Sequence, residues 1–111
     1  MIAIRGATTV SKDTEKEIKE NSLQLFDEII KENNLDKDKI ISLLITATKD
    51  IKSAYPGKFI RLERNLDQAA ILHFQEMEVE GSLELCIRFL INYKDDISYK
   101  NIYLKKANNL R

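Results

Sequence analysis

Six polar residues of this sequence could together bind an anion: Arg5, Lys58, Arg61, Glu76, Arg88 and Tyr103. Arg5 and Arg88 lie inside apolar segments, where a guanidinium can hold a carboxylate through two parallel hydrogen bonds in a poorly hydrated place. Glu76 adds an acceptor among these cations. Several cations with one carboxylate suit an anionic ligand that also carries a hydroxyl or an amine. The chemistry to expect is therefore recognition of a small organic anion.

The overall charge balance hides this arrangement. The chain of 111 residues has 18 Lys and Arg against 18 Asp and Glu, and 13 of its cations are lysines, which gather in polar stretches. A net charge of zero argues against a nucleic-acid-binding domain, which normally carries a basic excess. We therefore expect a small-molecule ligand and no nucleic-acid partner.

The common enzyme templates are absent from the sequence. It contains no GxGxxG, no P-loop, no HExxH and no Cys/His pair with metal-ligand spacing. His73 is the only histidine and Cys86 the only cysteine, so one chain can form neither a disulfide nor a zinc site built from thiolates. We predict an activity that needs no metal and no cofactor, and we expect Cys86 to be an inert strand residue.

The sequence also predicts a cytoplasmic location. The first residues lack a basic leader followed by a long apolar stretch, so no signal peptide is expected. No uninterrupted apolar run approaches the roughly 18–20 residues that span a bilayer, so we expect no membrane partner.

The elements that must position the polar residues alternate between strand and helix periodicity. Strands are predicted over 1–10, 40–48, 69–74, 86–93 and 102–107, with helices over 14–33 and 58–64. Thr14 or Asp13 should cap the long helix and Asn33-Asn34 should end it. No linker or repeat divides the chain. We therefore predict a single α+β domain over residues 1–111, with a five-stranded mixed sheet packed by one long and one short helix.

Two of the predicted strands need packing partners on both faces, and the predicted helices cannot supply them all. Residues 40–48 are almost continuously apolar, which is typical of a strand buried on both faces. Residues 86–93 should alternate, with Ile87, Phe89, Ile91 and Tyr93 on one side and Cys86, Arg88, Leu90 and Asn92 on the other. One long helix covers only one face of a sheet. The remaining cover most simply comes from other copies of the chain, so we expect a homo-oligomer.

Seven blocks of the sequence resemble the small monofunctional bacterial chorismate mutases, from residue 2 to residue 111. They are Ile4-Arg5-Gly6-Ala7-Thr8-Thr9-Val10, Asp13-Thr14-x-x-Glu17-Ile18, Ala47-Thr48-x-Asp50, Tyr55-Pro56-x-Lys58, Gln75-Glu76-Met77, Cys86-Ile87-Arg88, and Ile102-Tyr103-Leu104-x-Lys106-Ala107 with Leu110-Arg111. Because the blocks occur in order along the whole chain, they indicate a family far more strongly than any single motif.

The resemblance implies a fold, a reaction and a set of roles. Members of the family form a trimer with a pseudo-α/β-barrel, bind at clefts between subunits, and rearrange chorismate to prephenate on the route to phenylalanine and tyrosine. By resemblance, Arg88 donates to the ether oxygen of chorismate, Arg5 and Tyr103 hold its carboxylates, and Glu76 accepts from its ring hydroxyl. The residues that match the pocket walls are Tyr55, Gly57, Lys58, Arg61, Leu72, His73, Phe74, Gln75 and Leu110.

The chain departs from that family at three places. His73 stands where many relatives have cysteine, so a side-chain contact of the family is not carried over to it. The link between Arg88 and Tyr103 is slightly shorter, and the chain stops at Arg111, where many relatives continue into a tail. Arg64 and Arg111 match no part of the pocket, and we expect both to be surface residues.

Two other functions fit an anion pocket. One is a trimeric protein that hydrolyses reactive imines or enamines, with an arginine for the substrate carboxylate. The Gln75-Glu76-Met77 and Cys86-Ile87-Arg88 blocks disfavour it, because such a protein should carry a different arginine motif. The other is a non-catalytic anion-binding or regulatory module, which would bind prephenate without converting chorismate.

Overall fold

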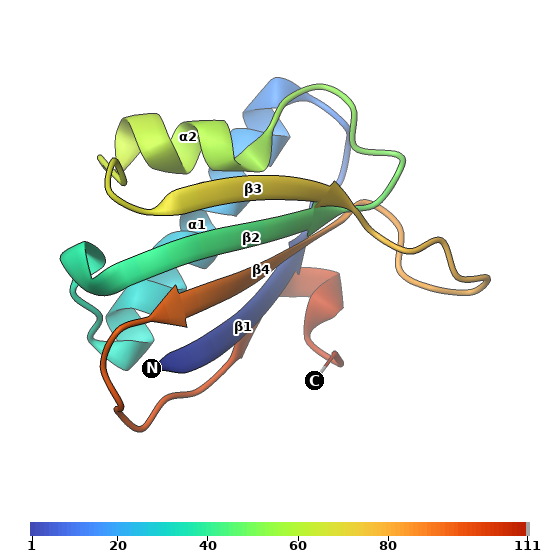
Figure 1. The fold of residues 1–111 in the computed structure, drawn as a ribbon. Helices are drawn as coiled ribbons and strands as arrows, with labels where there is room; N and C mark the ends of the chain where they lie inside the picture. Colours follow the sequence, from blue (N-terminus) through green and yellow to red (C-terminus); the bar gives the residue numbers. More distant parts are fainter. Residues whose placement is uncertain (111) are drawn as a thin grey trace.

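The centre of the fold is a five-stranded mixed sheet with strand order β3-β2-β4-β1-β5 (Figure 1). A computed structural model describes residues 1–110. The elements are β1 (Ile2–Thr9), α1 (Glu15–Asn33), β2 (Ile40–Ala47), α2 (Pro56–Glu63), β3 (Ala70–Gln75), β4 (Cys86–Tyr93) and β5 (Ile102–Tyr103), with short 3-10 turns at Lys37–Lys39 and Lys105–Ala107. Strand β4 pairs antiparallel with β1 and β2, whereas β3 and β5 add parallel strands at the two edges. The predicted fold class is confirmed.

Helix α1 begins and ends where its capping residues predict. The Thr14 side chain accepts a hydrogen bond from the backbone N–H of Glu17 at 3.2 Å, and Asn34 closes the helix in the left-handed conformation at φ 50°. The Glu17 carboxylate accepts from the N–H and hydroxyl of Ser11. Asp13 does not cap the helix, because its carboxylate binds the chain at Lys52 and Ser53.

A glycine lets α1 lie close to the sheet beside Arg5. The buried face of the helix includes Ile18, Leu25 and Ile29. A Cβ on Gly6 of β1 would stand 2.7 Å from Ile29 Cδ1 and 3.2 Å from Leu25 Cδ1. Glycine at this position therefore permits the close helix–strand packing that supports the strand bearing Arg5.

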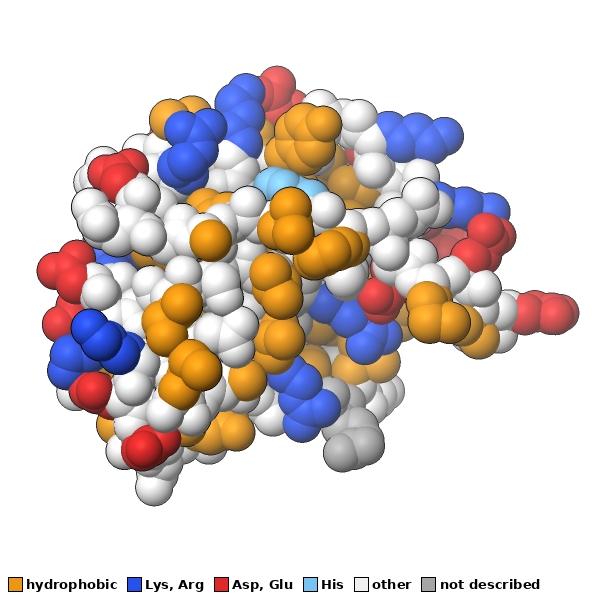
Figure 2. Space-filling view, viewed as in Figure 1, with side chains coloured by type: hydrophobic (Ala, Val, Ile, Leu, Met, Phe, Trp, Pro, Cys, Tyr) orange, Lys and Arg blue, Asp and Glu red, His pale blue; other side chains and the backbone are white. Residues whose placement is uncertain are grey.

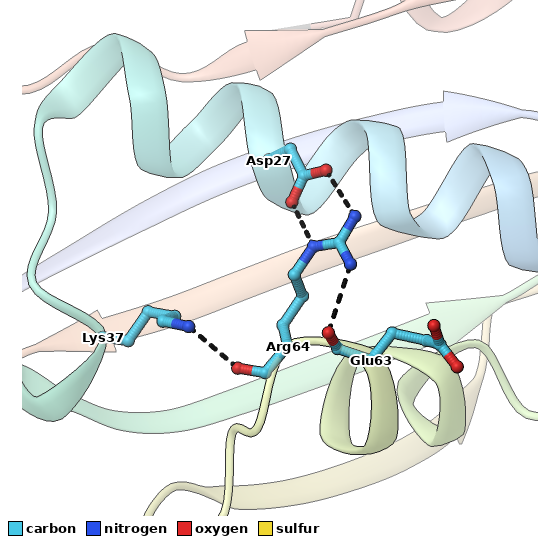
Figure 3. Close-up of polar contacts among 4 residues, drawn as sticks. All are labelled: Asp27, Lys37, Glu63 and Arg64. Carbon is cyan, nitrogen blue, oxygen red and sulfur yellow. Dashed lines mark hydrogen bonds and ion pairs between the residues drawn. The ribbon is translucent and has the colours of Figure 1, made fainter.

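An arginine that we expected on the surface joins the end of helix α2 to helix α1. The guanidinium of Arg64 donates to both carboxylate oxygens of Asp27 at 2.8 Å, and Lys37 Nζ donates to the Arg64 carbonyl at 3.0 Å (Figure 3). A forked pair of this kind fixes orientation as well as contact. Arg64 is thus a surface residue, as expected, with its side chain 33% exposed, and it has a structural role in addition.

Both helices pack on one face of the sheet, and the other face is open. The core of α1, α2 and the sheet includes Leu43, Ile45 and Ile87. On the opposite face hydrophobic side chains gather over β2, β3 and β4 (Figure 2), among them Leu72, which is 53% exposed, and Phe74, which is 48% exposed. The predicted alternation of β4 is confirmed. Strand β2 is buried on its helix-covered face and only partly buried on the other within the described residues, so the second cover that we expected from other copies is not supplied by the single chain.

The last predicted strand is shorter than expected. Only Ile102 and Tyr103 pair with β1, and the predicted residues 104–107 leave the sheet. Leu104 N–H still donates to the Ala7 carbonyl at 2.9 Å, but Lys105 turns the chain at φ 53° and the Thr9 hydroxyl accepts from Lys106 N–H. A side chain therefore replaces the strand ladder at the end of β1. Arg111, expected on the surface, lies outside the described residues.

Candidate active site

A cavity of about 390 Å³ opens on the free face of the sheet, lined by residues of all five strands and by Glu76 after β3. It is lined by Arg5, Gly6, Ala7, Leu44, Thr46, Phe74, Glu76, Arg88, Phe89, Leu90 and Tyr103. The lining therefore includes all three predicted catalytic residues, Arg5, Glu76 and Arg88. Arg5 is far from the other two in sequence, and the order of the strands brings them together.

An ion pair crosses this cavity. Arg88 Nε lies 2.7 Å from Glu76 Oε2, with the two side chains 44% and 23% exposed. Arg88 stands opposite Thr46 in the β4–β2 pairing, and Thr46 stands opposite Phe74 in the β2–β3 pairing. Glu76 follows two residues after Phe74 and so returns to the same face. The pair therefore spans β2 on the open face of the sheet, and both charged residues line one cavity.

Arg5 and Tyr103 form the other side of the cavity. Ala7 pairs with Tyr103 in the short β1–β5 ladder, and Arg5 lies on the same face of β1 as Ala7. Asn101 Oδ1 accepts from the backbone N–H of Arg5 at 2.8 Å, which fixes the chain just before Tyr103. The Tyr103 hydroxyl is buried and has no hydrogen-bond partner among the described residues. A buried hydroxyl of this kind is costly unless a ligand, a water or another chain satisfies it.

The remaining predicted residues form a second group beside α2. Hollows of about 450 Å³ and 710 Å³ flank this helix, and both are lined by Tyr55, Lys58 and His73. Arg61 lines the smaller hollow, whereas Phe74 and Gln75 line the larger one. The two groups thus belong to different hollows of one chain, with only Phe74 shared by the cavity and this second group.

Leu72 and Leu110 belong to neither group. Leu72 lies on the open face opposite Leu44, and Leu110 follows the last 3-10 turn, where its N–H donates to the Ala107 carbonyl. The cavity also includes Thr46, which sequence reasoning did not select. Its hydroxyl is buried and, like that of Tyr103, has no partner in the described part of the chain. The sequence signal for Thr46 was a threonine within an apolar run, two residues after Leu44 and therefore on the same face of the strand.

Comparison with known proteins gives a single family. The family model described as chorismate mutase type I matches residues 1–111. The chain belongs to the chorismate mutase type I family. Chorismate mutase AroH of Bacillus subtilis (strain 168) is 36% identical over 97% of this chain and 87% of its own length, and that of Thermus thermophilus is 30% identical over 97% and 91%. A solved chorismate mutase from Clostridium thermocellum has a TM-score of 0.94 and 38% identity over 99% of this chain and 100% of its own.

These findings confirm the predicted family and, with it, the predicted class of activity, a chorismate mutase and hence an isomerase. They favour the mutase activity over the imine or enamine hydrolase.

Some residues in the sequence blocks shared with the family have a structural role. Asp13 holds the 52–53 backbone, and hydrogen bonds from Lys52 and Ser53 lower the pKa of its carboxyl. Asp50 accepts from Leu85 N–H, and the Thr48 hydroxyl accepts from Cys86 N–H at the start of β4. These contacts fix the strand that bears Arg88.

The chemistry of the other reactive side chains is limited. Cys86 is buried, and this burial raises the pKa of its thiol, so the thiol stays protonated at neutral pH and is a poor nucleophile. No group of His, Cys, Asp and Glu side chains that could hold a metal ion occurs within residues 1–110.

Neither helix within residues 1–110 is long and apolar enough to cross a membrane.

Proposed function

We propose that this protein converts chorismate to prephenate in the cavity between β1, β4 and β5. The observation that carries the proposal is the Arg88–Glu76 ion pair, held at 2.7 Å beside Arg5 and a Tyr103 hydroxyl that has no partner within residues 1–110. Two guanidiniums, a carboxylate and a hydroxyl are the groups needed for an organic dianion with a ring hydroxyl. In the cell the reaction would lie in aromatic amino-acid biosynthesis, in the cytoplasm.

The proposed reaction needs neither a general base nor a nucleophile. In this Claisen rearrangement one C–O bond breaks and one C–C bond forms within a single molecule, and no proton is transferred. The protein can accelerate it by binding the folded conformer in which the two carbons already lie close together. It can also place fixed charge where charge develops as the ether bond breaks.

Arg88 supplies that charge in our proposal. The ether oxygen gains negative charge as its bond to the ring breaks, so a guanidinium beside it binds the transition state more tightly than the substrate. Glu76 keeps the guanidinium over β2 before substrate binds, and it then accepts from the ring hydroxyl. Arg5 and Tyr103 hold the carboxylates. No cofactor takes part.

We further propose that the complete site lies between subunits of a homotrimer. Lys58 and Arg61 lie on α2, apart from the cavity that holds Arg5 and Arg88, so one chain alone does not surround its ligand with both groups. The open face of the sheet, with Leu72 and Phe74 half exposed, offers the apolar surface for assembly. In the trimer the α2 group of one subunit would face the cavity of the next, and Tyr55, His73, Gln75 and Leu110 would complete the walls.

The test is the conversion of chorismate by the purified protein. We expect chorismate to disappear and prephenate to form without added metal or cofactor. Light scattering should give a mass three times the 12.9 kDa of the chain. A folded trimer that binds prephenate without accelerating the rearrangement would contradict the proposal and favour a non-catalytic binding module. A monomer with full activity would contradict the site between subunits.

A further inference from the structure

The side chain of His73, on β3, forms a hydrogen bond with the first turn of α2. The backbone N–H of Gly57 donates to His73 Nε2 at 3.0 Å. The imidazole also packs against the Tyr55 ring, with centroids 5.1 Å apart and the rings tilted by 56°. One side chain thus contacts residues on both sides of Pro56, where α2 begins. Lys58 follows directly, and Arg61 lies one turn further along the helix.

Gly57 and His73 fit each other sterically. A Cβ on residue 57 would lie 2.9 Å from both Cε1 and Nε2 of His73, and 2.8 Å from Ile71 Cγ2. Such distances are shorter than real Cβ contacts, so a larger residue at position 57 would displace the imidazole. Because Gly57 has no side chain, the imidazole fits beside the backbone of residue 57, and the Gly57 N–H can donate a hydrogen bond to it.

This bond requires the neutral imidazole. An Nε2 that accepts a hydrogen bond carries no proton, so the proton of the neutral ring must be on Nδ1. Burial lowers the pKa of His73 below its ordinary value, which favours the same form. The charged groups lining the hollows around the ring are Lys49 and Lys52 before α2, Lys58 and Arg61 on it, and the acidic Glu15 and Asp67. The four cations outnumber the two carboxylates, so this surrounding also disfavours an imidazolium.

We propose that His73, as a neutral acceptor, is a positioning residue for substrate binding: it fixes the start of α2 and thereby places Tyr55, Lys58 and Arg61 toward the ligand. The proposal rests on the proposed function, since the ligand is the dianionic substrate. Protonation of His73 removes the acceptor, adds a cation at the positive end of a helix, and releases the first turn. The bond acts on binding and leaves the ether-oxygen chemistry at Arg88 unchanged.

Nuclear magnetic resonance tests the bond without any substrate. Because His73 is the only histidine of the sequence, its ring nitrogens are identified without ambiguity in the 15N-labelled protein. We expect the Nδ1–H tautomer, a midpoint below that of a free histidine, and a Gly57 amide signal that shifts with the same midpoint. An Nε2–H tautomer, or a Gly57 amide that does not follow the titration, would overturn the proposal.

Chorismate kinetics test the positioning role. In the wild type, KM should rise and kcat should change little as the pH falls from about 8 to about 5.5. His73→Leu removes the acceptor and should raise KM about fivefold at pH 8, the equivalent of one lost hydrogen bond. His73→Gln places an amide oxygen near the position of Nε2, so its KM should be lower than that of His73→Leu and should not rise in acid.

Each kinetic outcome has one meaning. A His73→Leu protein with unchanged KM, or a loss confined to kcat, would overturn the positioning role. A rise of KM in acid that persists in His73→Gln would assign the titration to another group and overturn the proton-dependent part. Absence of chorismate conversion in the wild type would instead reject the proposed function, while the resonance experiment would still decide whether the His73–Gly57 bond exists.

Discussion

Arg88 and Glu76 form an ion pair of 2.7 Å across β2, although Arg88 lies on β4 and Glu76 follows β3, two strands that do not pair with each other. Thr46 of β2, the pairing partner of Arg88, lines the same cavity, and its buried hydroxyl has no partner in the described part of the chain. Both charges are partly exposed, so the pair contributes little to folding stability. In the proposed function, the role of the pair is to orient the guanidinium before the substrate binds.

Replacing Arg88 should remove most of the activity and leave the fold intact. Loss of one preorganised donor at a developing negative charge commonly costs about 3–4 kcal/mol, so Arg88→Ala should lower kcat by roughly 10²–10³-fold. The measurement is steady-state kinetics with chorismate, combined with the mass of the assembly. Arg64→Ala, which removes an arginine outside the cavity, is the matched control and should keep kcat within about twofold. If Arg88→Ala lost the assembly, the arginine would be structural.

Thr46→Val should stabilise the protein and reduce its activity. The substitution removes a buried hydroxyl that has no partner among residues 1–110, so the free energy of unfolding should rise by about 1 kcal/mol. It also removes a polar group from the cavity floor, and kcat/KM should fall several-fold. Thr46→Ser retains the hydroxyl and is the control for activity. Urea denaturation and kinetics measure the two effects, and a loss of stability in Thr46→Val would mean that the hydroxyl is paired.

The Asp27–Arg64 pair should contribute measurably to stability because it is forked and joins two helices (Figure 3). The expected contribution is about 1 kcal/mol, at the upper end for partly exposed pairs. A double-mutant cycle of Asp27→Ala and Arg64→Ala, measured by urea unfolding, isolates it. If the two substitutions changed the free energy of unfolding additively, the ion pair would contribute nothing to stability.

Asp13 should make stability depend on pH in the acid range. Hydrogen bonds from the Lys52 and Ser53 backbone lower the pKa of its carboxyl. A lowered pKa means that the stabilisation is present above the pKa of the unfolded chain and is lost as the pH falls through the folded value. Asp13→Ala should therefore cost about 1 kcal/mol at neutral pH, and less in acid. Urea unfolding at both pH values measures the difference, and an equal cost at both would contradict this account.

The elements with regular spacing could be predicted from the sequence. The strict alternation of Ile87, Phe89 and Ile91 correctly placed Arg88 on the opposite face of β4. Thr14 and Asn34 set the bounds of α1 because capping is a local interaction. The resemblance to chorismate mutases grouped Arg5, Glu76 and Arg88 from sequence motifs alone, and the strand order explains how residues so far apart meet in one cavity.

The remaining features depend on contacts that local pattern does not contain. The apolar run 40–48 does not reveal which face the helices cover, so the threonine at position 46 could not be assigned to the cavity from the pattern alone. Arg64 has a role only because α2 lies against α1 at Asp27. His73 bonds Gly57 because β3 and α2 pack together. Each of these is a tertiary relationship between distant residues, which neither periodicity nor composition records.

The most direct test of the account mixes two inactive proteins. Arg88→Ala lacks the arginine of the cavity, and the double variant Lys58→Ala/Arg61→Ala lacks the two cations of α2, here called the α2 group. If each site combines the cavity of one subunit with the α2 group of the next, random mixed trimers from equal amounts should contain about one quarter of intact sites. We predict recovery of about one quarter of the wild-type activity on mixing and reassembly. Mixed trimers with no activity beyond that of the two parent variants would contradict the account.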